Sequence, residues 1–537
     1  MKTISKKSML LVFTMLIAIS FLFTGCKGGK KEAEATNANN KSEKKDVNIK
    51  LEGGDWGEPN PYKTYPRGPG MSKTNLIYDS LIEKDEKRII PWLAEKWEVK
   101  SNGKEYLFKI REGVKWQDGK DFTPEDVKFT FDYYKKHPPV SKNIYIGKKC
   151  FIDKVEVLKD NYIKITVNTV NAASLENLGT TRIIPKHIWE KVEDPKKFDG
   201  KEAFIGCGPY MLEDYNKERG SYKFTAFEDY WGPKQNVKTI EFIPVSDSIL
   251  AFEKGDIDLV ESVKPDIAKK YENNKEYENN KEYKLIKGHN FFGYRLCLNM
   301  NKNPEFKDKN VRQAIAYAID EKEIVDKVMR GIGTEGSAAY LPKEHIWYNK
   351  DIKKYDYNVE KAKELLKGKN ITFQIIVSNK KDNLRMAELL KLQLEKTGMK
   401  VNVKSIDMKS RDAAVKSGDY EAIITEHGGW GKDADVLREL YKSNNDKNGG
   451  SVINSIPGYK NEEIDKLCMK QMQEMDPDKR KEIVFQLQEK IAEEIPMIPI
   501  INTSSISVHK TDKYDGYMNM YDHFVVSHSK LTYLQRK

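Results

Sequence analysis

An alternation of helical and strand patterns in the second half of the chain constrains the fold most strongly. Residues 361–366 open a helix, residues 371–377 form a short apolar run typical of a buried strand, residues 386–397 have an amphipathic helical pattern, and residues 401–406 alternate as a further strand. Helices that alternate with strands in this way cover the faces of a sheet. The pattern therefore predicts an α/β fold.

Length and composition limit the classes of protein to which the chain can belong. With 537 residues the chain is too long for a single hydrophobic core, so we expect about two to four domains. The 39% of hydrophobic and 33% of charged residues are typical of a globular protein with a highly charged surface. The formal charge of +11 comes from dispersed lysines without a dense basic block, so we expect no nucleic-acid partner.

The N-terminus has the pattern of an export signal. Three lysines precede an apolar run at residues 9–23, as in a secretory signal, which we predict at residues 1–25. An uncleaved anchor helix is the alternative, but the run is shorter than a bilayer span requires. In both cases we expect the protein to be tethered outside the cytoplasmic membrane.

The segment LFTGC at residues 22–26 resembles the bacterial lipobox, in which the cysteine carries a lipid and becomes the mature N-terminus. The resemblance implies that Cys26 is lipidated and that the lipid anchors the protein to the cell membrane, on the extracellular face of the cytoplasmic membrane. Residues 27–46 are polar and lack periodicity. Residues 26–46 are therefore predicted to be a lipidated cysteine followed by a flexible tether.

The other four cysteines, Cys150, Cys207, Cys297 and Cys468, are far apart and show no CxxC spacing. This spacing predicts no zinc site. Disulfides are possible in an exported protein, and the sequence leaves their pairing open.

A glycine-rich loop within residues 422–439 is the main candidate for ligand binding. An apolar run predicts a strand at residues 422–424, and the loop that follows is placed where α/β sheets bind ligands. Its glycines let the backbone approach a guest, its tryptophan offers an apolar wall, its aspartates offer anionic acceptors and its histidine offers a proton or metal site. An ordinary surface turn is the alternative. The candidate residues are His427, Gly429, Trp430, Asp433 and Asp435.

A second loop of similar composition, GGDWGEPNPY at residues 53–62, follows the first strand of the folded part. We predict that it forms a second wall of the same site through Asp55 and Trp56. The alternative is again an ordinary turn.

Two local features predict structural roles. Thr123 is followed three residues later by Asp126, which is close to a capping box at the start of a helix. In residues 308–324, the apolar residues fall on one helical face, and Arg312 is expected to hold an internal salt bridge.

Several blocks carry a resemblance to a known family. They are PWLAEKWEV at 91–99, GKEYLFKIREGVKWQDGK at 103–120, IGCGPYML at 205–212 and DKNVRQAIAYAIDEKEI at 308–324. These blocks resemble the extracellular solute-binding proteins of ABC importers, in the large peptide- and nickel-binding class called family 5. The resemblance extends over nearly all of residues 47–506.

The resemblance implies a type II periplasmic-binding-protein-like α/β fold with two lobes, a hinge and an extra subdomain in the first lobe. In this family the chain crosses between the lobes near the strand at residues 294–300, so Phe292 and Tyr294 are candidate ligand contacts near the hinge. The implied boundaries are 47–85 with 201–288 and 507–537 for the core of lobe I, 86–200 for the extra subdomain and 289–506 for lobe II.

The resemblance also implies a function. Members capture a solute between the lobes, and the closed form docks on the transmembrane permease of the importer. Peptide-binding members carry a Gly-Trp-x-x-Asp loop whose aspartate pairs with the α-ammonium of the peptide, and residues 429–433 match this spacing. We therefore expect a monomer without a cofactor that binds di- or oligopeptides through Asp433.

Two alternatives remain at this point. Nickel and metallophore members of the family use a histidine near this loop, so His427 allows a nickel complex as the transported ligand. An extracellular hydrolase is a remote alternative, because the chain contains neither an HExxH zinc motif nor a GxSxG elbow. We therefore expect no catalytic residues.

Overall fold

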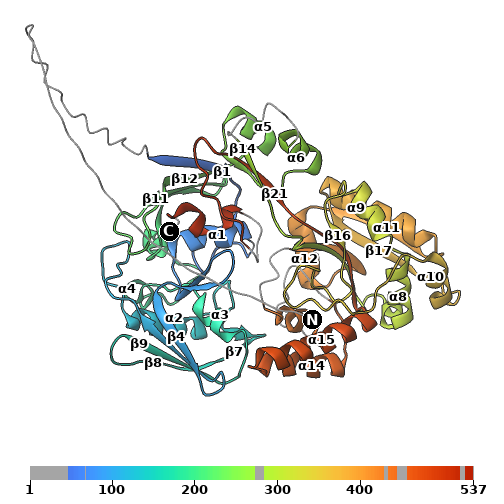
Figure 1. Ribbon diagram of the computed structural model, residues 1–537, viewed down its shortest axis with the longest axis horizontal. Helices are drawn as coiled ribbons and strands as arrows, with labels where there is room; N and C mark the ends of the chain where they lie inside the picture. The colour runs from blue at the N-terminus through green and yellow to red at the C-terminus, as the bar shows by residue number, and fades with distance from the viewer. Residues whose placement is uncertain are drawn as a thin grey trace, which may run out of the picture. The chain divides into compact units, whose positions relative to one another are not determined.

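The computed structural model describes residues 46–537 except 67, 273–282, 428–432, 444–455, 521–525 and 536–537 (Figure 1). The predicted signal peptide and Cys26 lie outside the described residues. Among the helices of the described part, none is long and apolar enough to cross a membrane.

A six-stranded mixed sheet with the order β16-β20-β15-β19-β17-β18 forms the centre of lobe II. Strands β17 (Thr372–Ser378) and β18 (Lys400–Ile406) are parallel, and helix α11 (Lys381–Glu395) connects them, so the predicted alternation is confirmed. The helix predicted at 361–366 is the C-terminal part of α10 (Val359–Leu366). The other strands are β15 (Phe292–Leu298), β16 (Thr334–Glu335), β19 (Ala422–His427) and β20 (Met497–Thr503).

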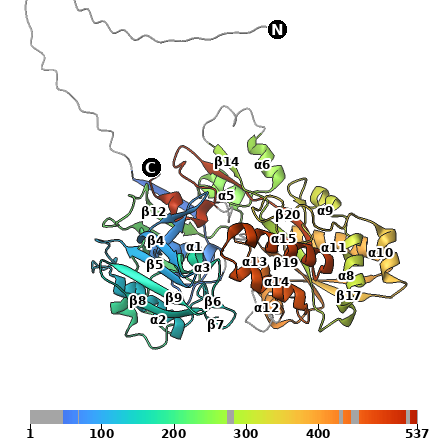
Figure 2. The same cartoon turned by 60° about the horizontal axis from the view of Figure 1, so that its bottom comes forward.

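Helices pack around this sheet and bury a continuous apolar core with it. Two of them, α14 and α15, pack side by side, as Figure 2 shows. The helices of this lobe include α8 (Lys309–Ala318), α9 (Glu321–Lys327), α12 (Met408–Ser417), α13 (Val436–Tyr441), α14 (Glu462–Gln473) and α15 (Pro477–Glu494).

Arg312 on α8 forms the internal ion pair that the sequence predicts. Its side chain is 3% exposed, and Nη2 lies 3.2 Å from Oε2 of Glu494. Nη1 donates a hydrogen bond to the backbone carbonyl of Phe306 at 3.0 Å. Arg312 therefore joins α8 to the end of α15.

Lobe I is built on a four-stranded sheet with the order β1-β12-β11-β10. Its first strand, β1 (Val47–Glu52), pairs in parallel with β12 (Val237–Ile243), and helix α1 (Gly68–Ile77) packs against the sheet. A three-stranded sheet with the order β13-β21-β14 continues the lobe. The other elements are β10 (Tyr210–Asn216), β11 (Ser221–Ala226), α5 (Ser248–Lys254), β13 (Leu259–Val260), α6 (Pro265–Glu272), β14 (Tyr283–Lys287) and β21 (Ile506–Lys510).

The extra subdomain of lobe I contains an antiparallel sheet with the order β4-β5-β9-β8, against which α2 (Pro124–Lys136) packs. The capping box of Thr123 and Asp126 is present at the start of α2, as the sequence predicts. One apolar core continues from this subdomain into the four-stranded sheet. Its other elements are β2 (Ile82–Lys84), β3 (Ile89–Pro91), β4 (Ala94–Lys100), β5 (Glu105–Ile110), β6 (Tyr145–Ile146), β7 (Lys149–Cys150), β8 (Ile152–Val157), β9 (Tyr162–Val167), α3 (Ser174–Gly179) and α4 (Lys186–Trp189).

Two short connections join the lobes. Residues 288–291 connect β14 to β15, and residues 504–505 connect β20 to β21. The amide of Gly288 donates a hydrogen bond to the carbonyl of Ser505 at 3.0 Å, so the two connections run side by side. They form the hinge of a two-lobed α/β protein.

Candidate functional site

Strand β19 delivers the glycine-rich loop from the middle of the lobe II sheet. It lies between β15 and β17, and it confirms the strand predicted for residues 422–424. Its last residue, His427, is paired in register with Gly293 of β15. The side chain of His427 and the whole of Gly429 and Trp430 lie outside the described residues.

Asp433, the predicted solute anchor, forms a two-pronged ion pair with Arg480. Oδ2 lies 2.8 Å from Nη1, and Oδ1 lies 2.6 Å from Nη2. Oδ1 also accepts the amide of Asp435 at 2.7 Å. A carboxylate has about four lone-pair positions, and donors among the described residues occupy three of them.

The two partners of this pair differ in exposure. The Asp433 side chain is 25% exposed, whereas that of Arg480 is 6% exposed. Arg480 also donates to the backbone carbonyl of Gln471 at 3.0 Å, which fixes the guanidinium against α14. The arrangement therefore presents a partly exposed carboxylate on a rigid support.

Asp435 is held within the protein by three hydrogen bonds. Its carboxylate accepts from Arg438 at 2.7 and 2.6 Å and from the amide of Gln471 at 2.9 Å. Burial would lower the pKa of Arg438, and the Asp435 carboxylate outweighs burial and raises it. Asp435 thus stabilises the fold beside Asp433, and its contact with a solute stays a prediction.

A third ion pair precedes the loop. Nη1 of Arg411 lies 2.7 Å from Oε2 of Glu426, and both side chains are buried. Ion pairs of arginine with a carboxylate therefore stand on both sides of residues 428–432. Sequence reasoning missed these three arginines. Only Arg438, three residues after Asp435 at the start of α13, has a local signal that could have revealed it.

Phe292 and Tyr294 lie on β15, next to the hinge. Their rings are 5.5 Å apart in an edge-to-face arrangement. Tyr294 is opposite Glu426 of β19, and burial raises the pKa of Tyr294. The structure thus places these two residues beside the strand that carries the glycine-rich loop.

Asp55 and Trp56 follow β1 in lobe I and contact the hairpin of β10 and β11. Oδ1 of Asp55 accepts from the hydroxyl of Tyr215 at 3.1 Å, and the amide of Trp56 donates to Oη of Tyr222 at 3.0 Å. Among the described residues, no hydrogen bond or ion pair joins these two residues to the glycine-rich loop. Their role as a second wall of the site stays a prediction.

Lobe I and lobe II also meet at a contact outside the hinge. The amide of Ala172, just before α3, donates to the carbonyl of Met472 in α14 at 2.8 Å. Met475, which follows α14, packs against the turn at Gly103, where a Cβ atom would lie 2.7 Å from Sδ of Met475. The C-terminal end of α14 therefore contacts the extra subdomain.

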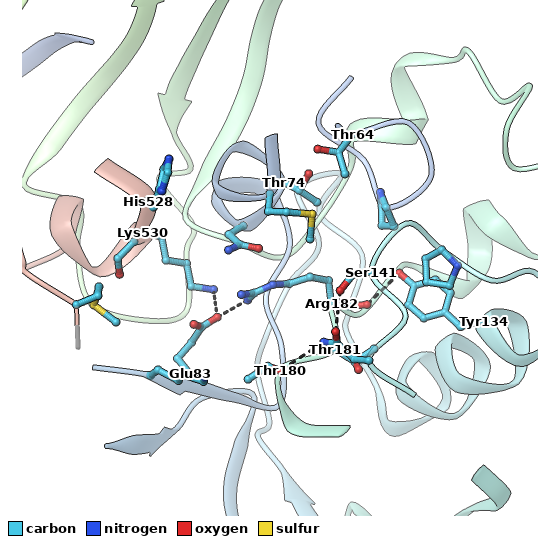
Figure 3. Close-up of a pocket in the computed structure, with 18 residues that line it drawn as sticks. Thr64, Thr74, Glu83, Tyr134, Ser141, Thr180, Thr181, Arg182, His528 and Lys530 are labelled. Carbon is cyan, nitrogen blue, oxygen red and sulfur yellow. Dashed lines mark hydrogen bonds and ion pairs between the residues drawn. The ribbon is translucent and has the colours of Figure 1, made fainter. Parts of the chain in front are cut away.

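A cavity of about 260 Å³ lies in lobe I between α1, the residues that follow α3 and the C-terminal segment (Figure 3). Glu83 at its wall forms ion pairs with Arg182 and with Lys530, whose Nζ lies 2.7 Å from Oε1. Burial would raise the pKa of Glu83, and the two cations outweigh burial and lower it to about 2. Sequence reasoning missed this cluster, because its members come from three distant parts of the chain.

The described residues contain no group of three His, Cys, Asp or Glu side chains that could hold a metal ion. The chain does match a family of known proteins. Residues 88–449 match the model of the middle region of the bacterial extracellular solute-binding proteins, family 5. The chain belongs to this family. Proteins of this family bind solutes outside the cell for transport.

Curated relatives of family 5 cover most of the chain. The dipeptide-binding protein of Escherichia coli (strain K12) is 30% identical over 390 residues, which are 66% of this chain and 70% of the relative. The oligopeptide-binding protein AppA of Bacillus subtilis (strain 168) is 26% identical and covers 91% of this chain and 92% of its own.

A solved structure extends the similarity to the fold. The structure of NikZ from Campylobacter jejuni in complex with Ni(L-His) has a TM-score of 0.78 and 21% identity, and it covers 91% of this chain and 99% of its own. At this level of identity the likeness concerns the two-lobed fold alone.

Proposed function

We propose that this protein is the peptide-binding component of an ABC importer, which captures di- or oligopeptides between its lobes and delivers them to the permease. The proposal is supported by the peptide-binding relatives that span most of the chain. The observation that carries it is the carboxylate of Asp433, which Arg480 holds at the end of the glycine-rich loop.

Asp433 suits the α-ammonium of a peptide because its carboxylate is rigid and partly exposed. The ammonium would use the lone-pair position that Arg480 and Asp435 leave unoccupied. An ammonium that is removed from water without a partner costs several kcal/mol, so this contact would be a strong anchor. Peptides whose α-amine is blocked should lose it.

Capture would proceed by closure of the lobes about the hinge. A solute shifts the population towards the closed form only when it binds that form more tightly, which requires contacts to both lobes. The contact of α14 with the extra subdomain is the kind of interaction that closure completes. The closed form would then dock on the permease, with the lipid on Cys26 holding the protein at the membrane.

The first test is to release and identify the solute that co-purifies with the protein by mass spectrometry, and to measure peptide affinity by calorimetry. Asp433→Ala is expected to weaken peptide binding by about 2 to 5 kcal/mol, because it removes a charge partner from the ammonium. Asp433→Asn keeps the shape of the side chain and should weaken binding as well.

Asp419→Ala is the matched control, because Asp419 also lies in lobe II but is 79% exposed and, among the described residues, pairs with Lys302. Its peptide affinity should equal that of the wild type. Unchanged affinity in both Asp433 variants would remove Asp433 from the site. Turnover of a peptide during the titration would contradict a pure binding function.

Nickel titration with and without free histidine tests the alternative solute. Heat that depends on both nickel and histidine, and that disappears in His427→Ala, would replace the peptide by a metal complex. Absence of such heat together with peptide binding would support the proposal.

A further inference from the structure

Among the described residues that line the cavity of lobe I, none is a predicted contact of the site described above. It is bounded by α1 on one side and by the residues around Arg182 on the other, with Lys530 of the C-terminal segment closing it (Figure 3). Its volume of about 260 Å³ is just below the roughly 300–1,000 Å³ typical of sites for whole small molecules. The cavity therefore suits one end group of a larger solute.

Arg182 brings unused hydrogen-bond donors to this cavity. Its Nη1 donates to Oγ of Ser80 at 2.9 Å and pairs with Glu83. Among the described residues, none accepts a hydrogen bond from its Nε or Nη2, and its side chain is 15% exposed. Because a guanidinium carries five N–H donors in a planar fork, Arg182 can bind a further acceptor without giving up Glu83.

Two neutral side chains at the cavity also lack partners in the described part of the chain. Thr64 is 4% exposed, and its Oγ1 is buried without a hydrogen bond. The amide of Asn75, on α1, makes no hydrogen bond with a described residue and also lines the cavity. A buried hydroxyl without a partner costs free energy, and a ligand oxygen in the cavity would remove that cost.

The charged side chains around the cavity are held in ion pairs. Among the described residues that line it, the cations are Lys84, Arg182 and Lys530, and the carboxylate is Glu83. Glu83 is already bound by Arg182 and Lys530, and Lys530 also pairs with Asp79 behind the wall. Lys84 pairs with Glu176, so each of these cations has a carboxylate partner, and the capacity for a further anion lies in the unused N–H donors of Arg182. The fork of an arginine is the best-fitting partner for a carboxylate.

We propose that this cavity binds a carboxylate of the transported solute, with Arg182 as its principal partner and Thr64 and Asn75 as neutral donors. The proposal rests on the proposed function, since the solute is then a peptide whose ammonium lies at lobe II and whose C-terminal or side-chain carboxylate lies at lobe I. A solute held in this way contacts both lobes, as closure requires.

The interlobe contact connects the two ends of such a solute. Arg182 follows α3, and the residue just before α3, Ala172, is hydrogen-bonded to Met472 of lobe II. Met472 is next to Gln471, which binds both Arg480 and Asp435. The segment that carries Arg182 therefore begins at the residue that contacts lobe II, and that contact lies one residue from the partner shared by Arg480 and Asp435.

Calorimetry with alanine peptides of about two to five residues, each as the free acid and as the C-terminal amide, tests the assignment. In the wild type, the amide is expected to bind on the order of ten- to hundred-fold more weakly than the acid, because it loses a hydrogen-bonded charge. The peptide length that gives the largest ratio of acid to amide affinity indicates how far Asp433 lies from Arg182 when a peptide is bound.

The variants Arg182→Gln and Thr64→Val are compared with the wild type for this acid-to-amide ratio. Arg182→Gln should weaken binding of the acid and bring the ratio close to one. Thr64→Val removes a hydroxyl that has no partner among the described residues, so it should leave stability unchanged and lower the ratio several-fold. Arg88→Gln is the control, because Arg88 is an 80% exposed arginine of lobe I whose pair with Asp85 spans 3.8 Å.

The outcomes separate this assignment from the proposed function. Peptide binding with equal affinity for acid and amide in the wild type would overturn the cavity assignment alone. An unchanged ratio in Thr64→Val and in a folded Arg182→Gln would also overturn it. Failure of every peptide to bind would overturn the proposed function, and this assignment with it.

Discussion

Individual arginine residues fix the orientation of two carboxylates in this protein. Asp433 and Arg480 are 47 positions apart, and their side chains form a two-pronged ion pair beside the glycine-rich loop. Glu83 and Arg182 are 99 positions apart, and they pair at the cavity of lobe I. In both places an arginine fixes a carboxylate in one orientation, as recognition of a charged solute requires.

The pair at the cavity should make stability depend on pH in the acid range. Because the folded pKa of Glu83 is lowered from 4.5 to about 2, the unfolded protein binds more protons in this window. The stabilisation by Glu83 is complete above about pH 4.5 and is lost as pH falls towards about 2, in total about 3 kcal/mol. Urea unfolding of the wild type should show this loss.

Glu83→Gln provides the comparison. The variant should be less stable than the wild type at neutral pH, and the difference should shrink as pH falls, because glutamine cannot be protonated in this range. A difference between the two proteins that stays constant from neutral pH to about pH 2 would contradict the assignment of the shift to Glu83.

At the scale of elements, helix α1 carries a buried lysine, Lys73, whose charge makes burial of the helix less favourable. Lys73 is 2% exposed, and its Nζ lies 3.9 Å from the ring centroid of Phe242 and 3.1 Å from the carbonyl of Pro69. Burial lowers the pKa of Lys73 to about 7, and attraction to Glu261 opposes this shift. Apolar packing therefore stabilises the helix, and burial of the Lys73 ammonium lowers that stability.

Lys73→Met should stabilise the protein at neutral pH by about 2 to 4 kcal/mol, because the buried ammonium is removed and the volume is kept. Since the folded pKa is lowered, the unfolded wild type binds more protons between about pH 7 and 10.5, and wild-type stability from this group rises with pH in that window. The advantage of the variant should therefore shrink at about pH 9.5.

Lys128→Met on α2 is the control for this measurement. Lys128 is a 39% exposed residue that pairs with Asp132 on the same helix, so its replacement should change stability by at most about 0.5 kcal/mol. A Lys73→Met variant no more stable than Lys128→Met would contradict the cost assigned to the buried charge.

At the scale of the whole molecule, the hinge and the contact at α14 together decide how the lobes meet. The hinge consists of two short connections, and the contact at α14 lies on the extra subdomain. Gly103 is at this contact with a φ of +82°, and a Cβ atom there would lie 2.7 Å from Sδ of Met475. The backbone conformation favours glycine here, and an added Cβ atom would displace the side chain of Met475 in the other lobe.

Gly103→Ala should therefore weaken the interlobe contact and lower peptide affinity several-fold. Gly113→Ala is a matched control, because Gly113 has a φ of +74° but nothing within 4 Å of an added Cβ. Both variants should lose about 1 kcal/mol of stability from the backbone conformation. Small-angle scattering should detect a larger radius of gyration for solute-free Gly103→Ala alone, and equal radii would contradict a role of this contact in closure.

The proposed lipid anchor makes a prediction for the whole cell. Cys26→Ser should abolish incorporation of labelled palmitate and move the protein from the membrane fraction to the medium or the periplasm, because the lipid is its only proposed attachment. Cys150→Ser is the control and should remain in the membrane fraction. Retention of unlabelled Cys26→Ser in the membrane would favour the uncleaved anchor helix.

Local patterns predicted several helices and strands of this protein, and the resemblance of its sequence blocks to family 5 predicted its family. Helix and strand periods reveal which face of an element is buried, which is why the alternation at residues 361–406 and the cap at Thr123 appear as predicted. The spacing of residues 429–433 likewise drew attention to Asp433.

Tertiary structure alone decided the partners of these residues. Arg480 meets Asp433, Arg182 meets Glu83 and Ala172 meets Met472 because helices and strands from distant parts of the chain pack together. An ion pair or a cavity depends on which surfaces come into contact in three dimensions, and periodicity along the chain carries no record of that contact.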